Sequence, residues 1–379
     1  MDAAFRAGLA GLVVGVSQLD VGRVAMLALG CALLYLAIAR EIEPLLLLPI
    51  GFGALLVNIP GAGLMEPGGV LRTFYDAGVL TEVFPVLVFI GIGAMTDFGP
   101  LLENPKILLL GAAGQFGIFL TLLLALALGF TVQQSAAIGV IGAMDGPTAI
   151  YVASRFAPEL LGPISVAAYS YMSLVPIIQP PIMRALTTKD ERLVAMGGVK
   201  RTVSRRAKLV FPVMVVIVGS LIAPQGTPLL GTIMLGNLLR ESGVVERLRH
   251  ASENEIANIV TLLLGVSIGA TMQAEQFLRL QTLLIVALGF VAIALDTTTG
   301  VLFGKLMCAL SGGKLNPLVG AAGISAFPMA ARVVQVEGQR YNKKNYLLMH
   351  AMGANTGGQI GSVMAAGIML SVLRGLGYG

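Results

Sequence analysis

The segment GAMDGPTAIY, residues 142–151, holds a single carboxylate, Asp145, within one of the most apolar stretches of the chain. Gly146 and Pro147 follow Asp145 directly and predict a break in any helix at this point. Unpaired backbone groups cost several kcal/mol in hydrocarbon, so such a break survives only inside the protein, where its carbonyls can meet a ligand. A carboxylate beside free carbonyl oxygens suits a hard cation. We therefore interpret Asp145 as a cation ligand; the alternative is a simple N-cap of the half-helix that follows.

A second interrupted segment favours the cation site over the cap. GAAGISAFPMAARVVQ (320–335) aligns with GVIGAMDGPTAIYVASR (139–155) at one constant offset, which superimposes two glycines and the proline. Ala326 stands where the first segment has Asp145, so the two breaks share one carboxylate. Matching interrupted segments in two halves of an apolar chain are typical of secondary transporters.

The C-terminal half adds neutral oxygen donors and one cation. Asn316 and Ser325 flank or enter the second break, and Asn355 lies in a Gly-rich apolar helix. Neutral donors around one carboxylate favour a monovalent ion such as Na⁺ over Ca²⁺. Arg332 follows the second break on an Ala-rich helix face, where a cation is costly in a membrane. From the residues alone, Arg332 is either a functional residue of the core or an arginine that extends to the membrane surface.

The composition is that of a multi-pass membrane protein. Of 379 residues, 56% are hydrophobic and 12% are charged, and the mean hydropathy is +0.86. The charged fraction is about half that of a typical soluble domain. We predict an all-α polytopic protein with about ten to twelve membrane segments, too many for one globular core. The net charge of +5 does not indicate nucleic-acid binding, because the cations lie in short loops, where they set membrane topology.

We expect two inverted repeats, each with a broken helix, that form a transporter-like core held by scaffold helices. The divisions that the sequence predicts are scaffold helices at 1–82 and 209–255, repeats at 83–183 and 256–379, and a loop at 184–208. That loop is rich in Lys and Arg, which predicts that it is cytoplasmic. A moving core needs a fixed frame, so we also expect a homo-oligomer.

Four sequence blocks together resemble a known family. They are GAMDGPTAIY (142–151), YSYMSLVPIIQPPIMRALTT (169–188), GISAFPMAARVVQ (323–335) and HAMGANTGGQIGS (350–362). Over essentially its whole length the chain resembles the β subunit of the sodium-translocating, biotin-dependent decarboxylases that act on oxaloacetate, methylmalonyl-CoA, glutaconyl-CoA and malonate.

The resemblance implies a pump that decarboxylates carboxybiotin and couples CO₂ release to Na⁺ export with proton uptake. It implies Asp145, Asn316 and Asn355 as Na⁺ ligands. It also implies that Ser325 and Tyr171 form a further polar site, for Na⁺ or the proton. Gly320 and Arg332 match further functional positions of the family. The resemblance implies Gly320 as part of the Na⁺ site, and Arg332 with Tyr171 as the residues that bind carboxybiotin.

The same resemblance implies partners and a location. The chain has no biotin-attachment sequence, so biotin must arrive on a separate carrier subunit, loaded by a carboxyltransferase subunit. A small single-span membrane subunit and the bacterial cytoplasmic membrane complete this expectation.

Other interpretations stay open at this point. A stand-alone Na⁺/H⁺ antiporter, or a Na⁺-coupled transporter of organic anions, would also have repeats, breaks and one buried Asp. For Tyr171 the alternative is packing at a helix interface. For Asp296, in LDTTTG (295–300), we favour a residue that caps or interrupts a helix over a Na⁺ ligand.

Overall fold

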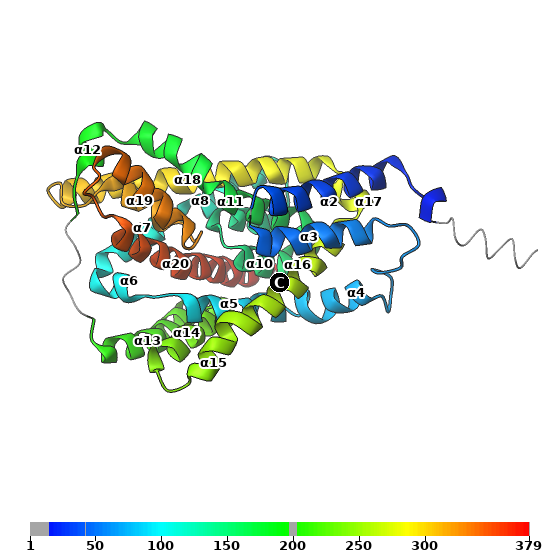
Figure 1. The fold of residues 1–379 in the computed structure, drawn as a ribbon, viewed down its shortest axis with the longest axis horizontal. Coiled ribbons are helices and arrows are strands. Elements are labelled where there is room, and N and C mark those ends of the chain that lie inside the picture. The colour runs from blue at the N-terminus through cyan, green and yellow to red at the C-terminus, as the bar shows by residue number, and fades with distance from the viewer. Residues whose placement is uncertain (1–14, 42, 197–202, 379) are drawn as a thin grey trace, which may run out of the picture.

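The computed structural model describes residues 15–41, 43–196 and 203–378, apart from the side chain of Ser173. Residues 1–14 of the predicted first scaffold segment and 197–202 of the predicted basic loop lie outside the described residues. Within the described ranges the chain forms helices and connecting turns, without strands (Figure 1). The predicted all-α class is therefore confirmed.

The elements follow one another along the chain, with η denoting 3₁₀ or π turns. They are α2 (Val21–Ala39), α3 (Pro44–Val57), α4 (Val70–Phe74), η1 (Tyr75–Val79), α5 (Val83–Met95), α6 (Gly99–Glu103), η2 (Pro105–Ile107), α7 (Leu108–Ala113), α8 (Phe116–Ala127), α9 (Val132–Gly139), η3 (Val140–Ala143), α10 (Gly146–Phe156), η4 (Pro158–Leu160), α11 (Leu161–Leu186), α12 (Lys189–Leu193), α13 (Arg205–Ile222), η5 (Pro224–Gly226), α14 (Thr227–Ser242), α15 (Glu246–His250), η6 (Ala251–Ile256), α16 (Ala257–Ala270), α17 (Ala274–Phe277), α18 (Leu280–Leu310), η7 (Pro317–Gly323), α19 (Met329–Tyr341) and α20 (Leu348–Gly375).

Several helices have the length and apolar character of membrane spans. Among the described residues, four stretches pass both criteria, and up to six do if each sharply bent helix pair is one span. The four are α2, η2 with α7 and α8, α18, and α20. A span of about 20 apolar residues crosses the hydrocarbon core of a bilayer. The chain is thus a multi-pass membrane protein, while the predicted number of ten to twelve segments is not tested by these helices.

Two pairs of short helices cross between the halves of the chain. The α3 helix packs on α16, and α5 packs on α14. Both crossings are close because glycines meet backbone: a Cβ on Gly269 would lie 2.1 Å from the Ile50 carbonyl oxygen, and one on Gly236 would lie 2.0 Å from that of Ile90. Small residues permit this approach between membrane helices. Each half therefore supplies one helix to a pair completed by the other half.

The first predicted broken segment is a hairpin whose two arms return to the same end of the molecule. The α9 and α10 helices pack against each other. At the base of the arms, Gln134 Nε2 donates to Glu159 Oε1 at 3.0 Å. Beside this base, Arg155 at the end of α10 makes a bidentate ion pair with Glu82, just before α5. The segment 132–156, the first hairpin, therefore does not cross the membrane as a single discontinuous helix.

The second broken segment, residues 316–341, forms the second hairpin. Both of its ends contact Arg192 on α12: Asn316 Nδ2 donates to the Arg192 carbonyl oxygen at 3.1 Å, and the Arg192 guanidinium donates to the Tyr341 hydroxyl. Next to this base, Arg184 of α11 donates to both carboxylate oxygens of Glu337, at 2.6 and 2.7 Å.

The two hairpins start at opposite ends of α11. Glu159 at the base of the first precedes that helix, and Arg192 at the base of the second follows it. This is the arrangement expected of inverted repeats. In Figure 1 the end that carries α12 and α6, called here the basic-loop end, is on the left, and the end that carries α4 and α17 is on the right.

Candidate functional site

The tips of the two hairpins meet inside the protein. The backbone N–H of Ser325 donates to the carbonyl oxygen of Ala143 at 3.2 Å. Met144 reverses the chain with a φ of 55°, in the left-handed region that few residues other than glycine adopt. Asp145 follows as the N-cap of α10. The break that the sequence predicts is thus present, and its carbonyl contacts the break of the second half.

Asp145 is buried, with 7% of its surface exposed, and accepts hydrogen bonds from neutral groups. Its Oδ2 atom accepts from the Thr148 hydroxyl at 2.7 Å and from the Ser362 hydroxyl at 3.1 Å. Oδ1 accepts from the Thr148 backbone N–H at 3.4 Å. Asp145 therefore does cap α10, as the simpler interpretation proposed. The cap and an ion site are compatible, because in the described part of the chain no cationic side chain forms an ion pair with the Asp145 carboxylate.

One face of α20 lies against both tips. Residues three and four apart share a helix face, and Asn355, Gly358 and Ser362 follow this spacing. Asn355 Nδ2 donates to the Ile324 carbonyl oxygen at 2.6 Å, and the Ser325 hydroxyl donates to the Gly358 carbonyl oxygen at 2.8 Å. With the Ser362 contact to Asp145, α20 joins the two hairpins into one polar cluster.

This cluster fits a monovalent cation. The Oδ1 atom of Asn355 is buried and has no hydrogen-bond partner in the part of the chain that the structure describes. Such an orphaned acceptor costs free energy unless a ligand satisfies it. The hydroxyl oxygens of Thr148, Ser325 and Ser362 and the Asp145 carboxylate surround the same tips. One carboxylate with neutral oxygens is a donor set for Na⁺ rather than for a divalent ion.

A cavity of about 420 Å³ reaches this cluster. Its lining includes Asp145, Ser325 and Phe327 at the tips, Met95 at the end of α5, and Glu253 of η6. Two residues after Met95, Asp97 pairs with Lys208, at the start of α13, at 3.8 Å. The cavity therefore borders both Asp145 and the end of α5 that leads towards α13.

The tyrosine that lines this cavity is Tyr169, not Tyr171. Tyr169 is buried, its ring lies against Gly146, and its hydroxyl has no hydrogen-bond partner among the described residues. Tyr171 instead contacts α18, where its hydroxyl donates to the Val286 carbonyl oxygen at 2.5 Å. Two residues on a helix are about 200° apart, so both cannot face the cavity. Sequence reasoning missed Tyr169, although it stands in the same YSY motif.

Asn316 and Gly320 lie apart from this cavity. The Asn316 amide is engaged at the base of the second hairpin, where Nδ2 also donates to the Val194 carbonyl oxygen at 2.9 Å and Oδ1 accepts from the Leu318 N–H at 3.0 Å. Gly320 packs against Gly300 of α18. The structure brings Asp145, Ser325 and Asn355 together, but it does not bring Asn316 or Gly320 to them. Their predicted role as Na⁺ ligands stays a prediction.

Arg332 lies one helical turn beyond Pro328, a residue that lines the cavity. Its side chain is exposed. The backbone N–H of Arg332 donates to the Pro328 carbonyl oxygen at 3.2 Å. Arg332 is thus near the hairpin tip in sequence, but its exposed side chain is not part of the buried cluster.

Ser362, Thr148 and Gln359 are polar residues of the site that the sequence did not identify. Gln359 lines the cavity, and its Oε1 accepts from the Thr96 hydroxyl of α5 at 3.3 Å. Their spacing along the helices could have identified them: Thr148 is three residues after Asp145, and Gln359 and Ser362 are four and seven residues after Asn355, so each shares a helix face with a predicted ligand.

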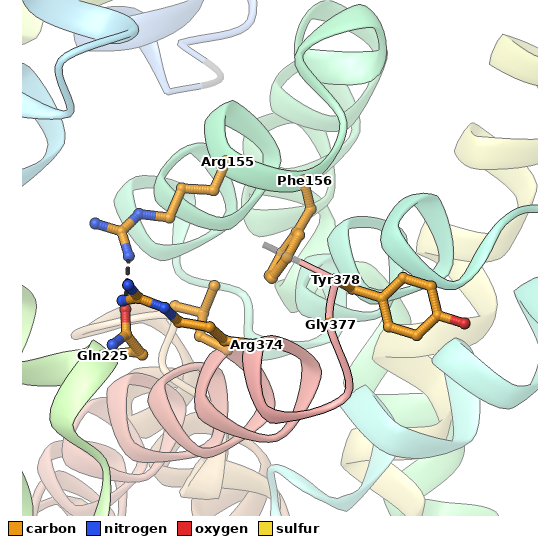
Figure 2. Close-up of a pocket in the computed structure, with 7 residues that line it drawn as sticks. Arg155, Phe156, Gln225, Arg374, Gly377 and Tyr378 are labelled. Carbon is orange, nitrogen blue, oxygen red and sulfur yellow. Dashed lines mark hydrogen bonds between the residues drawn. The ribbon is translucent and has the colours of Figure 1, made fainter.

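A second cavity, of about 330 Å³, lies beside the end of α10 at the base of the first hairpin (Figure 2). Figure 2 shows the guanidinium groups of Arg155 and Arg374 close to Gln225, while the Tyr378 ring points away from them. Gln225 Oε1 accepts from Arg155 at 3.2 Å. These contacts, with the Glu82 ion pair, hold the base of the first hairpin to the turn between α13 and α14. This cavity does not include Asp145.

Comparisons with known proteins agree with the geometry. Residues 22–373 match the family described as the Na⁺-transporting oxaloacetate decarboxylase beta subunit. Among similar proteins, the methylmalonyl-CoA decarboxylase subunit beta of Propionigenium modestum is 52% identical, over 94% of this chain and 96% of that protein. The glutaconyl-CoA decarboxylase subunit beta of Acidaminococcus fermentans is 54% identical, over 93% and 94% respectively. The oxaloacetate decarboxylase beta chain of Haemophilus ducreyi is 48% identical, over 95% and 97%.

Proposed function

Because the chain belongs to the family of β subunits of Na⁺-transporting decarboxylases, as a membrane subunit of a decarboxylase sodium pump, we propose that the cluster at the hairpin tips is its Na⁺ site. The observation that carries this proposal is the buried carboxylate of Asp145 at the contact between the two tips. We assign Asp145 as the charged ligand, supported by the neutral oxygens of Ser325 and Asn355. Ser362 and Thr148 hold the carboxylate in place.

The cavity suits carboxybiotin as the substrate. Biotin has to arrive on a carrier subunit, so the substrate must enter from the aqueous side on which that carrier moves. The cavity borders both Asp145 and Met95, at the end of α5. We propose that the substrate enters from the basic-loop end, which the positive-inside rule assigns to the cytoplasm. Arg332, one helical turn beyond the lining residue Pro328, would bind the carboxylate of carboxybiotin through several N–H donors.

A proton donor is needed when CO₂ leaves the biotin ring, because the ureido nitrogen must regain a proton. The hydroxyl that the cavity offers is that of Tyr169, a buried donor without a partner among the described residues. We therefore propose Tyr169 for this position, and Tyr171 as a residue that holds α11 against α18.

Transport follows from the contact between the hairpins. Na⁺ binding at Asp145 neutralises the buried charge, which lowers the cost of moving the tips together across the barrier. Export of one charge against 100 mV costs about 2.3 kcal/mol, so a decarboxylation that releases several kcal/mol can drive it. Na⁺ leaves on the opposite side, and one proton is taken up for each CO₂ released.

We further propose the partners that the family implies. They are a biotin-carrier subunit, a carboxyltransferase subunit, a small single-span membrane subunit and further copies of this chain, in the bacterial cytoplasmic membrane. The carboxyltransferase selects the acid or acyl-CoA that is decarboxylated. A stand-alone antiporter is not favoured, because the relatives of this chain are named as decarboxylase subunits.

The test replaces the carboxylate in the assembled complex. Asp145→Ala should lower Na⁺-stimulated CO₂ release by at least about 100-fold, since removing one member of a buried charge pair costs about 3–5 kcal/mol. The control is Asp76→Asn, an exposed Asp that pairs with Arg72 away from the site. Retained Na⁺ stimulation in the Asp145→Ala complex would remove this residue from the ion site.

A further inference from the structure

Asp296 is a second acidic residue buried in the core, apart from the cavity that reaches Asp145. Its side chain has no exposed surface, and neither carboxylate oxygen accepts a hydrogen bond of good geometry among the described residues; the nearest donor is the backbone N–H of Gly117. The sequence favoured a residue that caps or interrupts a helix. The structure contradicts this, because α18 continues through Asp296 from Leu280 to Leu310. A carboxyl group in the middle of an unbroken helix, with nothing to cap, needs another explanation.

The carboxyl group lies between α8 and the first hairpin. A Cβ built on Gly117 would lie 2.3 Å from Oδ1, and one built on Gly142 would lie 2.6 Å from Oδ2. Gly117 belongs to the first turn of α8, where helix N–H groups lack a carbonyl partner and favour a polar side chain. Gly142 is part of the first hairpin, three residues before Asp145. Both oxygens of Asp296 thus face backbone at close range.

Among the described residues, no cation forms an ion pair with Asp296. Of the elements packed on α18, α7, α8, α9, η3 and η7 contain no Asp, Glu, Lys, Arg or His. The remaining packed element is α11, whose titratable groups are engaged elsewhere: Tyr171 with the Val286 carbonyl, Arg184 with Glu337, and Tyr169 at the cavity. On α18 itself, Lys305 donates to the Leu186 carbonyl oxygen at 2.8 Å.

An ionised carboxylate in this position would cost several kcal/mol, so the group needs a bound positive ion. Na⁺ requires several oxygen ligands and the space to hold them. The two glycines approach the carboxyl oxygens so closely that not even a methyl group fits on those faces. A proton needs no additional space, and it removes the charge.

We propose that Asp296 is a proton-binding site of the core, and that the first hairpin controls its access to water. In this structure the carboxyl group is neutral: a proton taken from water is bonded to one Oδ atom. When the hairpin moves with its ion, Gly142 withdraws from Oδ2, water reaches the carboxyl group, and the proton leaves to water. The site goes beyond the proposed function, because it binds a different ion with a different residue and does not require carboxybiotin.

The experiment measures the protonated carboxyl group directly. The full chain is placed in phosphatidylcholine vesicles at neutral pH, and infrared absorption is recorded in the carbonyl-stretch region of protonated carboxylic acids, in NaCl and in choline chloride. The wild-type chain should show this band. Asp296→Asn, which keeps the shape of the side chain, and Asp296→Ser, which is smaller, should both lose one carboxyl equivalent of it. The control is Glu103→Gln, because Glu103 Oε2 is also buried without a partner among the described residues.

Coupling to the hairpin provides the second measurement. Na⁺ should shift the Asp296 band in the wild-type chain, and Asp145→Asn should abolish that response. A band that persists unchanged in both Asp296 variants, its loss in Glu103→Gln, or a wild-type band insensitive to Na⁺ would overturn the proposal. The readout does not involve CO₂ release, so failure of the carboxybiotin reaction would leave it unaffected.

Discussion

Gly358→Ala should separate α20 from the tip of the second hairpin. A Cβ on Gly358 would lie 2.3 Å from the Gly323 carbonyl oxygen and 2.9 Å from that of Ile324. Both atoms are backbone, so they cannot move aside as a flexible side chain does. The Gly358 carbonyl itself accepts the hydrogen bond from Ser325. The added methyl group therefore acts on the contact that holds the ion cluster together.

The size of the effect follows from the overlap. Ordinary contact for a Cβ begins near 3.4 Å, so the tip has to move by about 1 Å. Inserting a methyl group into a well-packed core costs about 1–3 kcal/mol. Misplacing reacting groups by about 1 Å can lower a rate by about 100-fold. We expect moderate destabilisation together with a loss of Na⁺-stimulated CO₂ release of about that factor.

The assay compares two Gly→Ala variants in the assembled complex. Gly231→Ala is the matched control, because Gly231 lies on α14 with open space where its Cβ would stand. An alanine there should stabilise the helix by about 0.5–1 kcal/mol and leave turnover unchanged. Thermal unfolding of the purified chain gives the stability, and CO₂ release as a function of Na⁺ concentration gives the activity. Equal activity of the two variants would refute the assignment of the tip contact to the ion site.

Two further substitutions test neighbouring contacts. Ser362→Ala removes a donor to Asp145; because a hydrogen bond to a charged group contributes about 1.5–3 kcal/mol, half-maximal CO₂ release should need about 10- to 100-fold more Na⁺. Ser371→Ala on the same helix is its control, and equal Na⁺ requirements of the two variants would contradict the prediction. Arg184→Ala leaves the buried Glu337 short of a counter-charge, and unfolding should become easier by about 1–2 kcal/mol, since the arginine is partly exposed. Adding Glu337→Gln should restore part of that stability; no recovery in the double variant would argue against charge as the cause.

The central features of the site could be predicted because their signals are local. Asp145 combines a charge with a helix break inside ten residues, and this combination has few structural explanations in an apolar chain. Ser325 lies beside the matching break of the second half. The contact between Ala143 and Ser325 then follows from the two breaks lying at the same depth.

Features that depend on the rotation of a helix could not be predicted. The motif YSY offers two tyrosines, and only the packing of α11 on α18 decides that Tyr169 faces the cavity and Tyr171 faces away. Asn316 has the chemistry of a ligand, but the two carbonyls that it binds come from a segment more than 100 residues earlier. Spacing along the chain contains no information about that contact.

The sequence predicted that a helix breaks at each hairpin tip. It did not predict that the chain then turns back to the end of the molecule from which it came. The sequence shows where a helix stops. The direction of the arm that follows depends on contacts at the hairpin base, such as Gln134 with Glu159 in the first hairpin and Tyr341 with Arg192 in the second. Asp296 was misinterpreted for a related reason. Its neighbours Gly117 and Gly142 come from other elements, and a glycine in the sequence does not indicate which side chain packs against it.

The exchange of helices between the halves has a consequence for biosynthesis. When the ribosome has made α3, its partner α16 is still about 200 residues away. The newly made α3 has 14 residues, fewer than a stable lone span needs. After insertion into the lipid, α3 can pack on α2, but the face that contacts α16 stays uncovered until the second half is made. A chain that stops after α11 should be a substrate for membrane proteases rather than a folded half.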